Sequence, residues 1–149
     1  MVTTVGTESR IDDLLHDLVE LDFDAAAAYD AAIKRLENGS FKTTLQGFRE
    51  DHLRHTRELG DCLRGMRKDV PTEGDSKQLL TEGKVVLAGL MGDKSILQAM
   101  RTNEEDTVTA YDRAVNHRDC TAEVHQILMR GQADEHRHRS WMVSTLDRM

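Results

Sequence analysis

Cysteine, proline and aromatic residues are scarce in this sequence of 149 residues, which contains two cysteines, one proline and 4% aromatic residues. Cys62 and Cys120 form no Cys-x-x-Cys motif, which argues against a disulfide scaffold and against a thiolate zinc site. So few aromatic residues also disfavour a sandwich or barrel of many strands. Because Pro71 is the single proline, long stretches remain free to form helices.

Long apolar runs and an excess of basic residues are absent as well. The longest run of apolar residues and glycine, Val85 to Gly92, is too short to span a bilayer, and no secretory signal is predicted within Met1 to Arg10. The chain has 20 basic and 27 acidic residues, a net charge of −7, and no basic stripe. We therefore expect a protein of the cytoplasm that binds neither nucleic acid nor membrane.

Apolar residues recur at helical spacing along most of the chain. This pattern predicts long helices over residues 9–38, 41–68, 94–118 and 121–148, and a shorter helix over residues 76–91. We expect a capping box from Ser9 to Asp12 to begin the first helix and Asn38-Gly39 to end it. Asp93 is expected to cap the third long helix.

The lengths of the connections predict how these helices are arranged. Connections of roughly two to five residues join the first two long helices and the last two, and such short loops produce antiparallel hairpins. The middle connection of about 25 residues is long enough to return along the whole bundle. We therefore predict an all-α single domain over residues 1–149, a four-helix bundle of two hairpins joined by a long crossover that contains the short helix.

The two hairpins repeat one another in sequence. The second hairpin follows the first at an offset of 82 residues in its first helix and 83 residues in its second helix. Six polar residues lie on the expected core faces and belong to this repeat: Asp22, His52, His55, Glu104, Glu135 and His138. A bundle with pseudo-twofold symmetry would bring the two sets face to face.

The six polar residues have the composition and spacing of a metal site. A buried carboxylate or imidazole without a partner costs several kcal/mol, so these side chains need a common partner. His52 with His55, and Glu135 with His138, are spaced i, i+3, which lets both members of a pair reach one ion. Nitrogen and oxygen ligands without sulfur suit iron or manganese and tolerate zinc.

The charge of this ligand set leaves the number of ions open. Asp22, Glu104 and Glu135 supply three negative charges, whereas two divalent ions carry four positive charges. A hydroxide, an oxide or Asp51 could complete the count, or the site could hold one ion tightly and a second ion weakly.

Four further residues are expected near the ligands. Asp51 and Asp134 precede His55 and His138 by one turn, and we expect them to accept hydrogen bonds from these histidines. Tyr29 and Tyr111 lean toward the helix N-terminus, which brings each hydroxyl toward the ligand layer, although helical tyrosines mostly serve packing.

The pattern resembles the ferritin-like di-iron carboxylate proteins, especially the rubrerythrin-type bundles and the bacterial ferritin-like domain proteins, over about residues 9–148. Their half-site has a carboxylate followed seven residues later by tyrosine, and then Glu-x-x-His on the next helix. Glu104 to Tyr111 and Glu135-x-x-His138 match this motif, whereas Asp22 and His52 stand where the first half would have glutamates. The resemblance implies two iron ions, reaction with dioxygen or peroxide in metal or oxidative stress, and Tyr29 and Tyr111 as candidate catalytic residues.

Three functions from different classes remain open. The first is a di-iron oxidoreductase of ferroxidase or peroxidase type. The second is a metal-binding or carrier protein without turnover, which the missing fourth carboxylate favours. The third is a structural bundle with a degenerate site that acts in assembly, and the sequence leaves open whether the chain forms a homo-oligomer.

Overall fold

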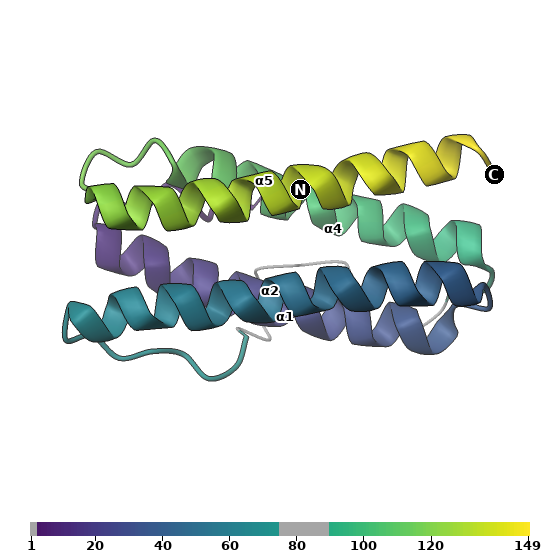
Figure 1. The fold of residues 1–149 in the computed structure, drawn as a ribbon, viewed down its shortest axis with the longest axis horizontal. Helices are drawn as coiled ribbons and strands as arrows, with labels where there is room; N and C mark the ends of the chain where they lie inside the picture. Colours follow the sequence, from purple (N-terminus) through teal and green to yellow (C-terminus); the bar gives the residue numbers. More distant parts are fainter. Residues whose placement is uncertain (1–2, 75–89) are drawn as a thin grey trace.

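The computed structural model describes residues 3–74 and 90–149, and this part of the chain contains four helices and no strand (Figure 1). The helices are α1 (Ile11–Arg35), α2 (Gly39–Gly65), α4 (Asp93–Ala114) and α5 (Ala122–Asp147). These elements confirm the predicted all-α four-helix class. The short helix expected over 76–91 falls almost entirely on residues 75–89, which lie outside the described residues.

The helices form two antiparallel hairpins, α1 with α2 and α4 with α5 (Figure 1). Figure 1 places the end of α2 and the start of α4 at opposite ends of the bundle, as the predicted crossover requires. Around the bundle, α1 packs beside α2 and α4, and α5 packs beside α2 and α4. The contacts between hairpins are therefore made by α1 against α4 and by α2 against α5.

Two predicted features at the ends of α1 are wrong. The expected capping box at Ser9 is absent, because the N-cap of α1 is Arg10 and makes no side-chain cap hydrogen bond. The guanidinium of Arg10 instead donates to both carboxylate oxygens of Asp12, each at 3.0 Å. Asn38 does not end α1, which stops at Arg35, but is the N-cap of α2 and accepts a hydrogen bond from the Phe41 amide at 3.0 Å. Asparagine is a favoured N-cap because its short side chain reaches such an orphan amide.

Asp93 is the first residue of α4 rather than its cap, which is Gly92. Its carboxylate accepts hydrogen bonds from the backbone amides of Glu37 at 2.8 Å and Asn38 at 3.0 Å. Asp93 therefore ties the turn of the first hairpin to the start of the second. Its charge at the N-terminus of α4 is also favourable toward the helix dipole.

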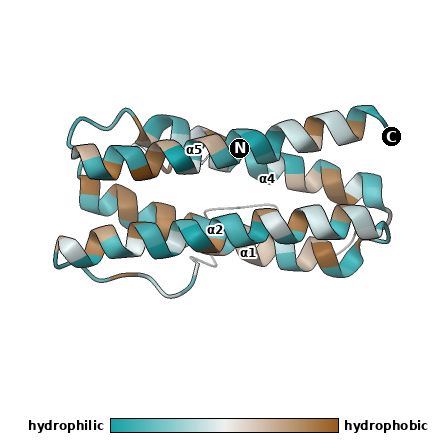
Figure 2. Cartoon of the chain, in the orientation of Figure 1, coloured by the Kyte–Doolittle hydropathy of each residue, from teal (hydrophilic) through white to brown (hydrophobic). Residues whose placement is uncertain are grey.

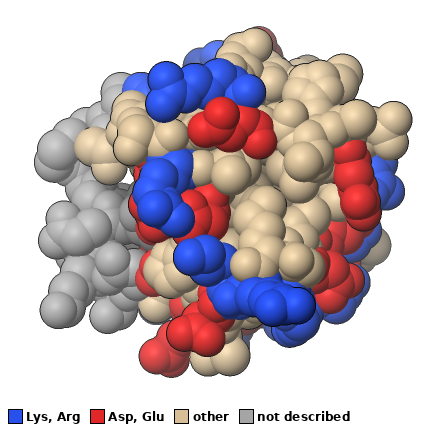
Figure 3. All heavy atoms as spheres, turned by 90° about the vertical axis from the view of Figure 1, so that its left-hand side faces the viewer, with Lys and Arg blue, Asp and Glu red and all other residues tan. Residues whose placement is uncertain are grey.

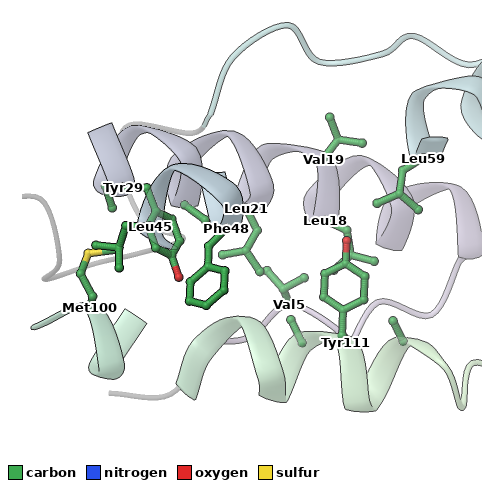
Figure 4. Packing of buried hydrophobic residues seen from close by; sticks show 14 of the residues in the cluster. Val5, Leu18, Val19, Leu21, Tyr29, Leu45, Phe48, Leu59, Met100 and Tyr111 are labelled. Carbon is green, nitrogen blue, oxygen red and sulfur yellow. The ribbon is translucent and has the colours of Figure 1, made fainter. Parts of the chain in front are cut away.

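The core follows the predicted apolar stripes. Figure 2 shows hydrophilic and hydrophobic residues alternating along each helix, and Figure 4 shows the buried side chains meeting between the helices. Leu14, Leu18, Leu45, Leu97 and Leu128 are fully enclosed. Burial of one such leucine contributes roughly 1.5–3 kcal/mol, so packing holds the helices rigidly around the polar residues on the same stripes.

The surface of the bundle is strongly charged. At the end seen in Figure 3, acidic and basic side chains are interspersed rather than gathered by sign. Among the residues that the structure describes, no helix has both the length and the apolar character needed to cross a membrane.

Candidate metal centre

The six polar residues of the repeat meet inside the bundle. Each comes from the middle of its helix: Asp22 from α1, His52 and His55 from α2, Glu104 from α4, and Glu135 and His138 from α5. None of these residues is more than 4% exposed. We call them the polar cluster. The helical spacing found in the sequence thus places all six side chains in one buried region.

One half of the cluster surrounds Asp22. Asp22 Oδ1 lies 2.7 Å from His52 Nδ1 and 3.1 Å from His55 Nδ1. Glu135 Oε1 lies 3.4 Å from each of these two nitrogens. These four residues, which we call the Asp22 half, bring ligand atoms close enough to hold one metal ion.

The other half surrounds Glu104. Glu104 Oε1 lies 3.6 Å from His52 Nε2 and 3.8 Å from His138 Nδ1, and Glu135 Oε2 lies 3.5 Å from His138 Nδ1. Glu104, Glu135, His138 and His52 form a second group of the same kind, the Glu104 half. The two halves share His52 and Glu135, so the candidate ligands form two overlapping groups.

Four buried atoms of the cluster have no hydrogen-bond partner: His52 Nε2, His138 Nδ1, Glu135 Oε1 and Glu135 Oε2. Leaving a buried polar atom unpaired typically costs about 1–3 kcal/mol, and more when the group is charged. All four atoms point toward neighbouring ligand atoms at 3.4–3.8 Å, which is too long for good hydrogen bonds. A cation in each half would satisfy all four, so these residues fit a metal site.

The outer nitrogens of two histidines are held by carboxylates. His55 Nε2 donates to Asp134 at 2.9 Å, and His138 Nε2 donates to Asp51 at 2.8 Å. Asp51 and Asp134 therefore accept from histidines as expected, but each does so from the opposite hairpin, because α2 packs against α5. Donation from Nε2 leaves Nδ1 of each ring free to bind an ion on the inner side.

Asp51 lies outside both groups of candidate ligands. Besides His138, its Oδ2 accepts a hydrogen bond from Arg137 at 2.6 Å, and Asp51 belongs to neither ligand group. The hypothesis that Asp51 completes the negative charge is therefore not supported. Arg137 also donates to Asp134 at 3.1 Å, and Arg54 forms an ion pair with Asp134. Both arginines are therefore surface residues that pair with the outer aspartates.

These contacts keep both outer carboxylates ionised. Partial burial opposes the ionisation of Asp134, but hydrogen bonds from His55 and Arg137 outweigh it and hold the pKa of Asp134 well below its usual range. The same balance, with His138 and Arg137 as donors, lowers the pKa of Asp51. Both aspartates therefore remain acceptors that fix the orientation of the rings.

The two tyrosines donate to inner carboxylates. Tyr111 donates to Asp22 Oδ2 at 2.6 Å, and Tyr29 donates to Glu104 Oε1. Each tyrosine thus reaches the carboxylate of the other hairpin, since α1 packs against α4; Figure 4 shows both hydroxyls pointing into the interior. Burial, followed by the charges of Glu104 and Asp22 respectively, raises the pKa of both phenols well above 10, so they stay protonated donors.

Two further residues help to position Glu104 and Tyr111, and their roles could not be predicted from the sequence alone. Thr107 donates to Glu104 Oε2 at 3.0 Å; its position one turn after Glu104 was the available signal. Gly131 makes room for Tyr111, because a Cβ at this position would lie 2.4 Å from Tyr111 Cε1. A glycine in the middle of a predicted helix face was the signal for such a close approach.

Charge inside the cluster is balanced between carboxylates and imidazoles. Burial alone would lower the pKa of His52, but the surrounding carboxylates Glu135, Asp22 and Glu104 outweigh it and raise the pKa to about 10. Conversely, burial alone would raise the pKa of Glu135, but His52, His138 and His55 hold it well below its ordinary value. The carboxylates therefore attract positive charge into the cluster, which protons or metal ions can supply.

The sequence model of a family described as "Domain of unknown function (DUF2383)" matches residues 10–117. This range covers α1, α2 and α4 and ends before α5, and thus before Glu135 and His138. Neither the curated proteins nor the solved structures compared with this chain include a match.

Proposed function

This chain belongs to the DUF2383 family, and we propose from the polar cluster that it is a ferritin-like metal-binding protein holding two divalent ions, of iron type, inside one domain. The observation that carries this function is the set of unpaired buried atoms on His52, His138 and Glu135. These atoms face both halves of the cluster and have no hydrogen-bond partner, while the outer nitrogens of His55 and His138 are fixed by aspartates.

The donor set is compatible with iron. Three carboxylates and three imidazoles without sulfur suit iron or manganese and tolerate zinc. Bound iron would supply the electrons for reaction with dioxygen or peroxide. Tyr29 and Tyr111 would orient Glu104 and Asp22 by hydrogen bonds, and full burial would exclude bulk water from the ligands.

A second candidate function is metal binding without turnover. This function is favoured by His52, which stands where the ferritin-like Glu-x-x-His motif has its glutamate. The cluster therefore has three carboxylates instead of four. Three carboxylates supply three negative charges against the four positive charges of two divalent ions. The same ligand geometry serves both functions, and only the reaction of bound iron separates them.

An anaerobic titration with Fe²⁺ followed by exposure to dioxygen or peroxide tests the two functions. Two irons per chain that oxidise faster than free Fe²⁺ are expected for the oxidoreductase, and two irons without faster oxidation would establish the second candidate instead. His138→Gln should weaken binding, whereas His136→Gln should not, because His136 is half-exposed and pairs with Asp112 at 2.7 Å on the surface. Absence of any stoichiometric binding would overturn both functions.

A further inference from the structure

The ring of His52 lies between the two halves of the polar cluster, with one nitrogen facing each half. Nδ1 faces the Asp22 half, at 2.7 Å from Asp22 Oδ1 and 3.4 Å from Glu135 Oε1. Nε2 faces the Glu104 half, at 3.6 Å from Glu104 Oε1, and has no hydrogen-bond partner. His52 is fully buried, so water does not satisfy this nitrogen from outside.

The other two histidines of the cluster differ from His52 in this respect. His55 and His138 each turn Nδ1 inward and donate from Nε2 to an outer aspartate, which leaves one nitrogen per ring for metal. No outer carboxylate among the described residues is hydrogen-bonded to His52, since both of its nitrogens face inner ligands. His55 and His138 are each placed to bind one ion as terminal ligands, whereas His52 faces both halves as a shared ligand.

Glu135 is divided between the halves in the same way. Its Oε1 faces His52 Nδ1 and His55 Nδ1, while its Oε2 faces His138 Nδ1. Each half therefore receives two nitrogens and two carboxylate oxygens: one terminal histidine, one terminal carboxylate, one oxygen of Glu135 and one nitrogen of His52.

We propose that His52 bridges two divalent metal ions, binding the ion of the Asp22 half through Nδ1 and the ion of the Glu104 half through Nε2. This bridge presupposes the two-ion site proposed above. His52 would then take the bridging role of the glutamate in the ferritin-like Glu-x-x-His motif, with an imidazole ring in place of a carboxylate.

The bridge also lets the ligands balance the charge of two divalent ions. A ring that binds ions through both nitrogens carries no N–H proton, so the protons leave for solvent and the ring bears one negative charge. Asp22, Glu104 and Glu135 contribute three further negative charges. The total of four balances two divalent ions without hydroxide, oxide or Asp51, and no electron is transferred.

Nitrogen-15 NMR of the histidine rings tests the bridge directly. The full chain would be labelled at histidine, loaded with Zn²⁺ as a diamagnetic divalent ion, and its zinc content measured. In the two-zinc protein we expect both nitrogens of His52 to be metal-bound and without an attached proton. His55 and His138 should each show one metal-bound nitrogen and one protonated nitrogen, and His52→Gln identifies the His52 signals by their loss.

The outcomes separate the bridge from the metal site itself. Two bound zinc ions with a protonated nitrogen on His52 would overturn the bridge and leave the two-ion site standing. A single bound zinc ion would also overturn the bridge, and no bound zinc would overturn the metal site as well.

Binding affinities of two glutamine variants give a second readout. His52→Gln removes a nitrogen from both ions and should weaken both, whereas His55→Gln removes one terminal ligand and should weaken one. Both affinities are measured by competition with a zinc indicator. If the two variants weaken the binding of the same number of ions, His52 is not a shared ligand.

Discussion

The stability of this protein should depend on metal, and Glu135→Gln should abolish that dependence. An ion that binds the folded chain but not the unfolded chain adds about 2.7 kcal/mol to the free energy of unfolding at a hundredfold excess over its dissociation constant. For a chain of this length each kcal/mol raises Tm by about 2–4 °C. One saturating ion should therefore raise Tm by about 5–11 °C, and two ions by more.

Both ions should depend on Glu135, because its two oxygens face opposite halves of the cluster and have no hydrogen-bond partner. Glutamine keeps the size of the side chain but removes its charge and one oxygen. The metal-free variant should itself melt lower, since removing one partner of a buried ion pair costs about 3–5 kcal/mol and His52 loses a facing carboxylate. Metal should then raise its Tm little or not at all.

Differential scanning calorimetry of chelator-treated protein, with and without Fe²⁺, Mn²⁺ or Zn²⁺, measures both effects. Glu105→Gln is the matched control, because Glu105 is partly exposed and pairs with Arg139 at 2.8 Å outside the cluster. This control should keep the full metal-dependent shift. A parent protein whose Tm does not respond to saturating metal, or a Glu135→Gln variant that responds like the parent, would refute the metal site.

Four further outcomes are expected. In metal-free protein the carboxylates around His52 outweigh burial and raise the pKa of His52 from 6.5 to about 10. Protonated His52 therefore stabilises the fold fully below pH 6.5, and this stabilisation is lost as pH rises through 10. Metal affinity should show the opposite trend and rise with pH as protons leave the ligands, so melting curves with and without Zn²⁺ should diverge from acid to neutral pH. Gly131→Ala should cost about 1–3 kcal/mol in urea unfolding because its Cβ meets Tyr111, whereas Gly47→Ala, which meets nothing within 4 Å, should be neutral or stabilising. Asp93→Ala should cost about 1 kcal/mol, since two backbone amides of the first hairpin turn lose their acceptor, and a change in stability within error would show that water replaces it.

The sequence determined the helices, their buried faces and the membership of the polar cluster. A helical period of 3.6 residues fixes which side chains share a face, so Asp22, His52, Glu104 and Glu135 could be placed on core stripes without any structure. The repeat between the hairpins then indicated that these stripes meet. Helix ends were harder to predict, because Asn38 suits the end of one helix and the start of the next, and contacts such as those of Asp93 depend on packing between the hairpins.

Tertiary structure decided which partner each of these residues has. Spacing along one helix relates Asp51 to His55 and Glu104 to Tyr111, but α2 packs against α5 and α1 against α4, so Asp51 binds His138 and Tyr111 binds Asp22. Periodicity defines neighbours within a helix and contains no information on how two helices are aligned. The same limit applies to His52: the sequence placed it on a core face, and only the packing of four helices turned its two nitrogens toward different halves of the cluster.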